Sequence, residues 1–194
     1  MTLRQFSCGF LVVILACGGK DGGIDSGLPP DKTGDDLVPA EQQSLCEATA
    51  EYLDAHISAE EWTGYMCTLE GFGSGEATDL AGRIEECEQA RAACIAAGEQ
   101  EALGGFCDDD IDWTMCGATI AEIETCLTDA IDLLDSIIGD FSCDVLDPAK
   151  AQALQDKYGD KIEDPYPDSC DVVRAKCPQV IGAGSDAEPI EVNR

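Results

Sequence analysis

The sequence predicts an all-α protein: a disulfide-rich bundle of five or six helices that follows a flexible N-terminal tether. Three observations support this fold class. Apolar residues between about residue 41 and residue 178 recur at spacings of three and four, the period of one helix face, and no segment shows the strict alternation of a half-buried strand. Capping and stop signals divide this region into helix-sized segments. The region also carries an even number of cysteines, which suits disulfide pairing in an exported protein.

The first two helices are defined by periodicity and by a capping pattern. One helix begins near Glu41, and residues at i, i+4, i+7 and i+11 give it a face: Cys46, Ala50, Leu53 and Ile57. Ser58 and Glu61 have the spacing of a capping box, in which each side chain binds the other residue's backbone N–H. They predict a short second helix, which the glycine-rich run 71–75 ends.

Two longer helices are expected next. The first runs from Asp79 to Ala97, with Thr78 as its N-cap and Gly98 just beyond its end. The second runs from about Trp113 to Ile138. Its apolar face comprises Ile120, Ile123, Leu127, Ala130, Leu134 and Ile137.

The C-terminal part contains strong boundary signals. Asp147-Pro148 combines a capping side chain with a proline at the first helical position, and predicts a helix that ends near Gly159. Asp168 or Ser169 caps a last short helix, which Pro178 ends. The helical, cysteine-rich domain is therefore expected to occupy residues 41–178, with residues 179–194 as a flexible tail.

The cysteines of this domain are predicted to form disulfides. Zinc sites use closely spaced cysteine pairs or several histidines, whereas the closest cysteines here are seven positions apart and the chain has one histidine. An even set in an exported protein favours structural bridges. The set comprises Cys46, Cys67, Cys87, Cys94, Cys107, Cys116, Cys126, Cys143, Cys170 and Cys177.

Helix geometry limits the pairing. Two helical residues seven positions apart are separated by roughly 10.5 Å along the axis, whereas bridged Cα atoms lie within about 7 Å. Cys87 is therefore not expected to pair with Cys94, nor Cys170 with Cys177. We expect bridges across helical hairpins: Cys46–Cys67, Cys87–Cys126 and Cys94–Cys116. In a rival arrangement, the helix of residues 87 and 94 pairs with the helix of residues 170 and 177.

The N-terminal residues have the pattern of an export signal. Arg4 precedes an apolar run from Phe6 to Ala16, which is too short for a membrane-spanning helix of about 20 residues. Cys17, directly after a small residue, resembles the lipobox cysteine of bacterial lipoproteins. The resemblance implies that residues 1–16 are removed as a signal peptide and that Cys17 carries a lipid anchor. Gly18 then favours the outer membrane of the cell envelope. Ordinary secretion is the alternative.

Residues 17–40 are expected to form the lipidated cysteine and a disordered tether. Residues 18–40 contain six glycines, three prolines and five aspartates. Such a composition buries too little apolar surface to offset the entropy lost on ordering. As a flexible coil this segment would span roughly 26 Å and would hold the folded domain away from the membrane.

The charge of the chain restricts its partners. The 194 residues include 40 acidic and 11 basic side chains, for a net charge of −29. Proteins that bind phosphate backbones have the opposite balance, so nucleic acid is not an expected partner. A basic protein or peptide is compatible with this charge, which also keeps an exported protein soluble.

Two features could support chemistry. Asp108, Asp110 and Asp112 alternate as in the start of a calcium loop, but an EF-hand needs Gly and Glu where Trp113 and Thr119 stand. These aspartates are weak candidate ligands for another kind of divalent-cation site, or they place favourable charge at a helix start. His56, the only histidine, is expected near a helix end, where a cation suits the helix dipole.

The sequence therefore predicts a non-enzymatic interaction or structural module, anchored at the envelope and without a cofactor. One alternative is a calcium-binding protein that uses Asp108–Asp112; its thermal shift with calcium would be lost in Asp110→Ala. The other is an enzyme on an unrecognised helical scaffold, which would need a concave pocket with convergent polar groups.

Overall fold

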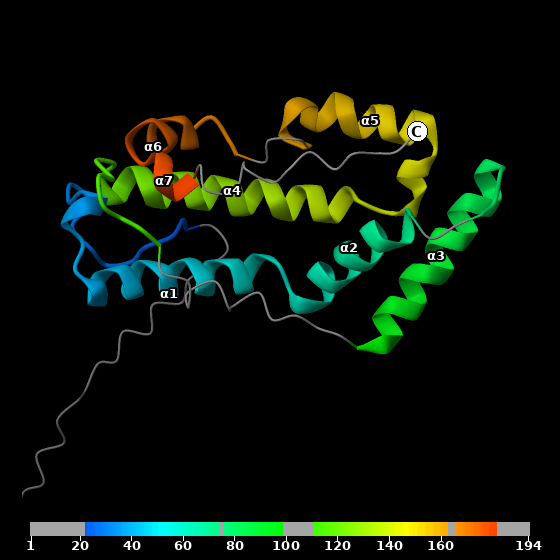
Figure 1. Cartoon of the computed structure of the whole chain (residues 1–194), viewed down its shortest axis with the longest axis horizontal. Coiled ribbons are helices and arrows are strands. Elements are labelled where there is room, and N and C mark those ends of the chain that lie inside the picture. Colours follow the sequence, from blue (N-terminus) through cyan, green and yellow to red (C-terminus); the bar gives the residue numbers. More distant parts are fainter. Residues whose placement is uncertain (1–21, 74–75, 99–110, 163–165, 182–194) are drawn as a thin grey trace, which may run out of the picture.

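Figure 1 shows the computed structural model of the chain, which describes residues 22–73, 76–98, 111–162 and 166–181. Most of these residues are helical, as predicted, and the described residues form no β-strand, although an isolated antiparallel bridge joins Thr33 to Thr119. The α-helices are α1 (Pro39–His56), α2 (Ala59–Gly71), α3 (Leu80–Ala97), α4 (Ile120–Asp140), α5 (Pro148–Tyr158), α6 (Cys170–Lys176) and α7 (Pro178–Ile181). The short 3-10 helices are η1 (Gly34–Asp36), η3 (Cys143–Leu146) and η4 (Gly159–Ile162).

Helix α4 organises the core. It buries residues along its whole length: Ile120, Ile123, Cys126, Ile131, Ile137 and Ile138. Helix α1 packs along one side of α4 and α6 along another, as Figure 1 shows. Helix α3 packs mainly against α2, and Cys87 is its one buried residue. The core therefore follows α4, and α3 is attached at its edge.

Two clusters of buried side chains lie along α4. The first surrounds its N-terminal half and includes Trp113, Ile120, Ile123 and two disulfides. The second surrounds its C-terminal half and includes Leu53 and Ile57. Leu127 packs against both clusters, so the two parts of the core are continuous.

The predicted helix boundaries are confirmed where a local cap defines them. The Ser58 hydroxyl accepts a hydrogen bond from the Glu61 N–H at 3.2 Å, and the Glu61 carboxylate accepts one from the Ser58 N–H at 2.8 Å. Asp147 caps α5 by accepting from the Ala149 N–H at 2.7 Å. The N-cap of α3 is Asp79, which accepts from the Gly82 N–H at 2.9 Å, and not the predicted Thr78.

The predicted start of the second long helix is wrong, because α4 begins at Ile120 and not at Trp113. The segment before it lies against η1 instead: the N–H groups of Gly34 and Asp35 donate to the carbonyls of Ala118 and Cys116, both at 2.9 Å. Met115 has a φ of 63°, which a helix cannot include. The apolar spacing from Trp113 onward arises because this loop and α4 enter the same core.

The tether prediction is wrong for residues 22–37, which pack on the helical domain and are called here the N-terminal strap. Ile24 is only 7% exposed and joins the second cluster, while Leu37 joins the first. The carbonyls of Lys32 and Pro30 accept hydrogen bonds from the N–H groups of Ile120 and Ala121 at 2.8 and 3.1 Å. The strap thereby satisfies N–H groups that the start of a helix leaves without partners, which compensates for its low apolar content.

The end of the domain also differs from the prediction. Residues 179–181 belong to α7 and not to a flexible tail, because Val180 packs against the first cluster. Residues 17–21 and 182–194 lie outside the described residues. Across the described ranges, none of the helices has both the length and the apolar character needed to cross a membrane.

Candidate functional site

The described cysteines form a disulfide framework within the core. The bridges are Cys67–Cys94, Cys87–Cys143, Cys116–Cys177 and Cys126–Cys170. They join α2 to α3, α3 to η3, the loop before α4 to the end of α6, and α4 to the start of α6. Cys46 is also disulfide-bonded. Cys17 and Cys107 lie outside the described residues.

The pairing confirms the geometric exclusions and corrects the expected partners. Cys87 and Cys94 bind cysteines of different elements, and so do Cys170 and Cys177. The pairs Cys46–Cys67, Cys87–Cys126 and Cys94–Cys116 are wrong, as is the rival arrangement. The reason is that α3 packs against α2 and η3, and not antiparallel to α4. Cys116 in addition precedes α4.

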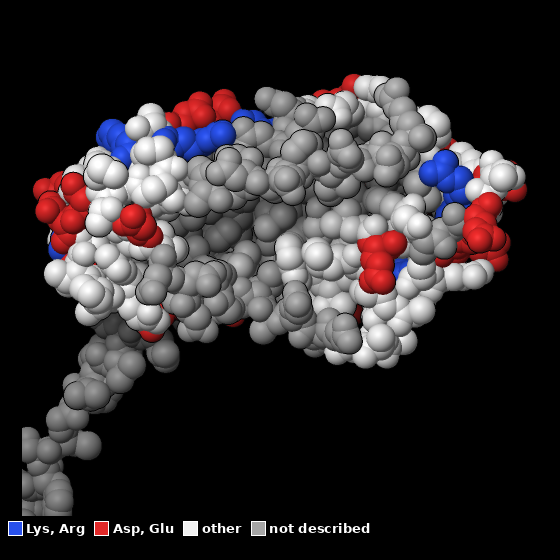
Figure 2. Space-filling view, viewed as in Figure 1, with Lys and Arg blue, Asp and Glu red and all other residues white. Residues whose placement is uncertain are grey.

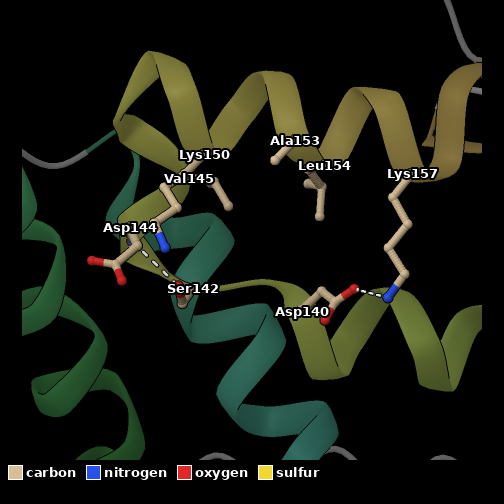
Figure 3. A pocket seen from close by; sticks show the side chains of 8 residues that line it. All are labelled: Asp140, Ser142, Asp144, Val145, Lys150, Ala153, Leu154 and Lys157. Carbon is tan, nitrogen blue, oxygen red and sulfur yellow. Dashed lines mark hydrogen bonds and ion pairs between the residues drawn. The ribbon is translucent and has the colours of Figure 1, made fainter.

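A hollow of about 280 Å³ lies between the C-terminal end of α4, η3 and α5, as Figure 3 shows. Its wall combines charged, polar and aliphatic side chains. The lining residues are Asp140, Ser142, Asp144, Val145, Lys150, Ala153, Leu154 and Lys157. The volume is slightly below the range of about 300–1,000 Å³ that is usual for ligand clefts. The hollow could admit a small polar molecule but not a large substrate.

The acidic group at one edge of this hollow is already bound by its neighbours. The carboxylate of Asp140 accepts hydrogen bonds from Lys157 Nζ at 2.5 Å and from Tyr158 Oη at 2.6 Å. These bonds hold the pKa of Asp140 below its usual value, and the carboxylate raises the pKa of Lys157. Burial, with a further contribution from Asp140, raises the pKa of Tyr158. At neutral pH the pair is therefore ionised and holds α5 against α4.

His56 is the last residue of α1, at the helix end where the sequence placed it. Its Nδ1 lies 2.8 Å from the carbonyl oxygen of Tyr52, and its ring stacks on the Tyr52 ring at 4.0 Å. Its Nε2 lies 3.9 Å from the carboxylate of Asp132 on α4. Tyr52 Oη donates to the same carboxylate at 2.9 Å, and burial together with Asp132 raises the pKa of Tyr52 to about 12. These contacts join α1 to α4.

The candidate cation ligands are placed only in part. Asp112 accepts hydrogen bonds from the N–H and the hydroxyl of Thr114 at 2.9 and 2.5 Å, which lower the pKa of Asp112. Asp108 and Asp110 lie outside the described residues, so a site that includes them stays a prediction. Within the ranges that the structure describes, no group of three or more His, Cys, Asp or Glu side chains is arranged to hold a metal ion.

Basic side chains are few and are spread over the molecule, with one group over α6. Figure 2 shows Lys and Arg over α6, with acidic groups on either side. Lys176 on α6 contacts Glu122 at 2.7 Å, and Lys161 contacts Asp168 at 3.0 Å. On the strap, Lys32 contacts Glu41 of α1 at 2.5 Å. Because acidic residues far outnumber basic ones, these pairs use only a small part of the carboxylates.

The strap contacts are the part of the surface that sequence reasoning missed. The N–H and hydroxyl of Ser26 donate to the Glu124 carboxylate at 2.8 and 2.6 Å, and the Ile24 N–H donates to Thr128 Oγ1 at 2.9 Å. The signal in the sequence was the presence of isolated apolar residues, such as Ile24 and Leu28, in a polar segment. Leu28 packs against the first cluster.

Comparisons with protein-family models, with curated proteins and with solved structures found no significant match to this chain. No relative supplies an activity that could be transferred to the hollow, to His56 or to the acidic surface. The function is therefore argued from the residues of the chain itself.

Proposed function

We propose that the protein is an exported lipoprotein that is anchored through Cys17 at the outer membrane of a bacterial envelope. Its helical domain acts as a non-enzymatic interaction or structural module, and its acidic surface favours a basic protein or peptide as partner. The proposal combines a lipobox-like cysteine, a disulfide framework and a strongly negative charge.

The disulfide framework is the observation that carries the proposal. Disulfides persist in oxidising compartments outside the cytosol. Three of the four bridges whose two partners are described have both cysteines at most 2% exposed, and these cysteines are Cys87, Cys116, Cys126, Cys143, Cys170 and Cys177. In the chain-entropy model each such bridge contributes about 4 kcal/mol, so this domain depends on a compartment where the bridges form.

The electrostatics of the described residues support a binding role. Asp140 is committed to Lys157 and Tyr158, and Asp132 is committed to Tyr52. Each carboxylate therefore serves to join two helices. The unpaired excess of acidic side chains gives a long-range field that attracts cationic partners and increases their rate of association.

Export and anchoring are tested by the intact mass and the free-thiol count of the protein isolated from its native envelope. We expect a lipid-sized increment on Cys17 and no thiol that can be alkylated before reduction. Cys17→Ala should release the domain from the membrane fraction, whereas Cys8→Ala, within the signal, should leave it anchored. Free thiols with bound zinc, or an unmodified Cys17, would overturn this part of the proposal.

The binding role is tested with a soluble chain that begins at Gly18. This chain should retain a basic protein from envelope extracts, and the purified partner should bind it with an affinity that falls as salt rises. Reversing a basic patch on that partner should abolish binding. Repeated failure to retain any partner at low salt would contradict an interaction role and leave a structural one.

A further inference from the structure

We infer that the side of the domain between α1 and α4, where the N-terminal strap begins, faces the membrane and lies close to the lipid headgroups. The inference rests on the proposed lipidation of Cys17 and concerns the geometry of the anchored protein. In this geometry the domain is held against the bilayer, whereas the sequence predicted a long tether that holds it away.

The strap is fixed to the domain almost from its first described residue. Ile24 is buried with Leu53, Ile57 and Ile131, and its N–H is bonded to Thr128 Oγ1 at 2.9 Å. Ser26 adds two hydrogen bonds to Glu124, at 2.8 and 2.6 Å. From residue 24 onward, the chain therefore cannot serve as a spacer between the anchor and the domain.

The remaining length of chain is short. Seven residue steps join Cys17 to Ile24, where the strap is fixed to the domain, and seven extended residues span at most roughly 25 Å. This limit holds for any conformation of the intervening residues. The point where the strap meets the domain must then lie within that distance of the lipidated cysteine, which itself sits at the headgroup level.

The point of attachment decides which side of the molecule faces the membrane. Thr128 lies within α4 and not at either end of it, and Figure 1 shows the strap beside the long sides of α1 and α4. A short link to this point brings the long side of the domain towards the bilayer. The side of α4 that carries Thr128, and not the end of the molecule formed by α3, is therefore expected to face the bilayer.

The charged side chains on this side of the domain determine which kind of lipid surface it can face. Asp129 and Asp132 are exposed on α4 near Thr128, and Asp25 is exposed on the strap. Carboxylates are repelled by anionic headgroups within about one Debye length, roughly 8 Å at physiological ionic strength. The facing lipid surface is therefore zwitterionic, and the short link, not electrostatic attraction, holds the domain there.

The test uses the mature chain, with Cys17 coupled through its thiol to a maleimide lipid in phosphatidylcholine vesicles. The coupling occupies the same sulfur atom that the cell would join to a lipid, so the geometry is decided whether or not lipidation occurs in the cell. Whether Cys17 is lipidated in the cell is decided separately, by the intact-mass measurement described under the proposed function. A small fluorophore is placed on a click-reactive amino acid at Asp129, or at the exposed Gln89 of α3 as the matched control.

Nitroxide-labelled headgroups should quench the fluorophore at position 129 more strongly than the one at position 89. Inserting a Gly/Ser segment of about 20 residues after Gly18, with a span of roughly 25 Å, should abolish that difference. The double variant Ile24→Asp/Thr128→Val should reduce the difference in quenching, because it releases the start of the strap. Circular dichroism should confirm that the helices remain. Equal quenching at both positions, or a difference that the insertion does not change, would overturn the inference.

Discussion

A single glycine allows the strap to reach the core. Gly34 is buried, and a Cβ at this position would lie 2.6 Å from Cys116 Sγ and 3.1 Å from the Trp113 ring. Cys116 cannot move aside easily because it is bonded to Cys177. The absence of a side chain at residue 34 therefore permits the hydrogen bonds between the strap and the loop before α4.

Gly34→Ala is accordingly expected to lower the free energy of unfolding by about 1–3 kcal/mol, the usual cost of overpacking a core. Gly117→Ala is the matched control, because a Cβ there meets nothing within 4 Å. It should leave stability unchanged or raise it by up to about 1 kcal/mol, through a lower entropy of the unfolded chain. Urea denaturation of the oxidised proteins measures both values. An unchanged midpoint for Gly34→Ala would contradict the close approach.

At the scale of elements, α2 and α3 are joined by the most accessible of the described bridges. Cys94 is half-buried on α3, whereas both cysteines of Cys126–Cys170 are at most 2% exposed. Thiol–disulfide exchange requires access of the attacking thiolate to a sulfur atom. The edge position of α3 thus makes its bridge to α2 the weakest point of the framework under reducing conditions.

Limited reduction without denaturant should therefore open Cys67–Cys94 before the other described bridges. Alkylation followed by peptide mass mapping should find label on Cys67 and Cys94 while Cys126 and Cys170 remain paired. Simultaneous loss of all four described bridges would show instead that reduction requires global unfolding.

The ion pair between α4 and α6 predicts a dependence of stability on pH. The hydrogen bond from Lys176 is the main cause of the lowered pKa of Glu122, whose ordinary value is 4.5. A carboxyl whose pKa is lowered by folding stabilises the protein above its unfolded value, and this contribution is lost as pH falls through the lower, folded value. Both side chains are partly exposed, at 33% and 42%, so the contribution is below about 1 kcal/mol.

Glu122→Gln should therefore reduce stability slightly at pH 7 and make no difference once the pH falls below the folded pKa of Glu122. Glutamine can still accept the hydrogen bond from the Thr119 N–H, so the helix cap is retained. Glu51→Gln, at an exposed position of α1, serves as the control. Chemical denaturation at several pH values tests this, and a loss of stability that persists at low pH would refute the assignment to the ion pair.

The elements differ in how well the sequence predicts them. Ser58, Asp147 and Gly98 act on residues within a few positions of themselves, so their signals are contained in short segments. The strap depends on partners that are distant in sequence: Ile24 and Thr128 are 104 positions apart, and Ser26 and Glu124 are 98 apart. Composition could not reveal such partners. The cysteine pairs failed for the same reason, because they depend on which helices are neighbours.

At the scale of the whole molecule, the excess of acidic residues acts on stability as well as on partners. With 40 acidic and 11 basic side chains, most carboxylates lack a cation, and their mutual repulsion favours the expanded, unfolded chain. Salt also weakens ion pairs such as Lys32–Glu41, but these involve far fewer groups. Screening of the repulsion should therefore outweigh the weakening of the pairs.

The midpoint of thermal unfolding is thus expected to rise when sodium chloride is increased from about 0.01 M to about 0.1 M, as the Debye length falls from about 30 Å to about 10 Å. Calcium chloride at the same ionic strength separates general screening from a specific site. Equal shifts of the midpoint with both salts would mean that calcium acts only by screening the repulsion between carboxylates. An additional rise with calcium that disappears in Asp110→Ala, but persists in the control Asp129→Ala, would instead assign a site to the segment Asp108–Asp112. A midpoint that falls with sodium chloride would show that paired charges, and not the excess of carboxylates, control the stability of the domain.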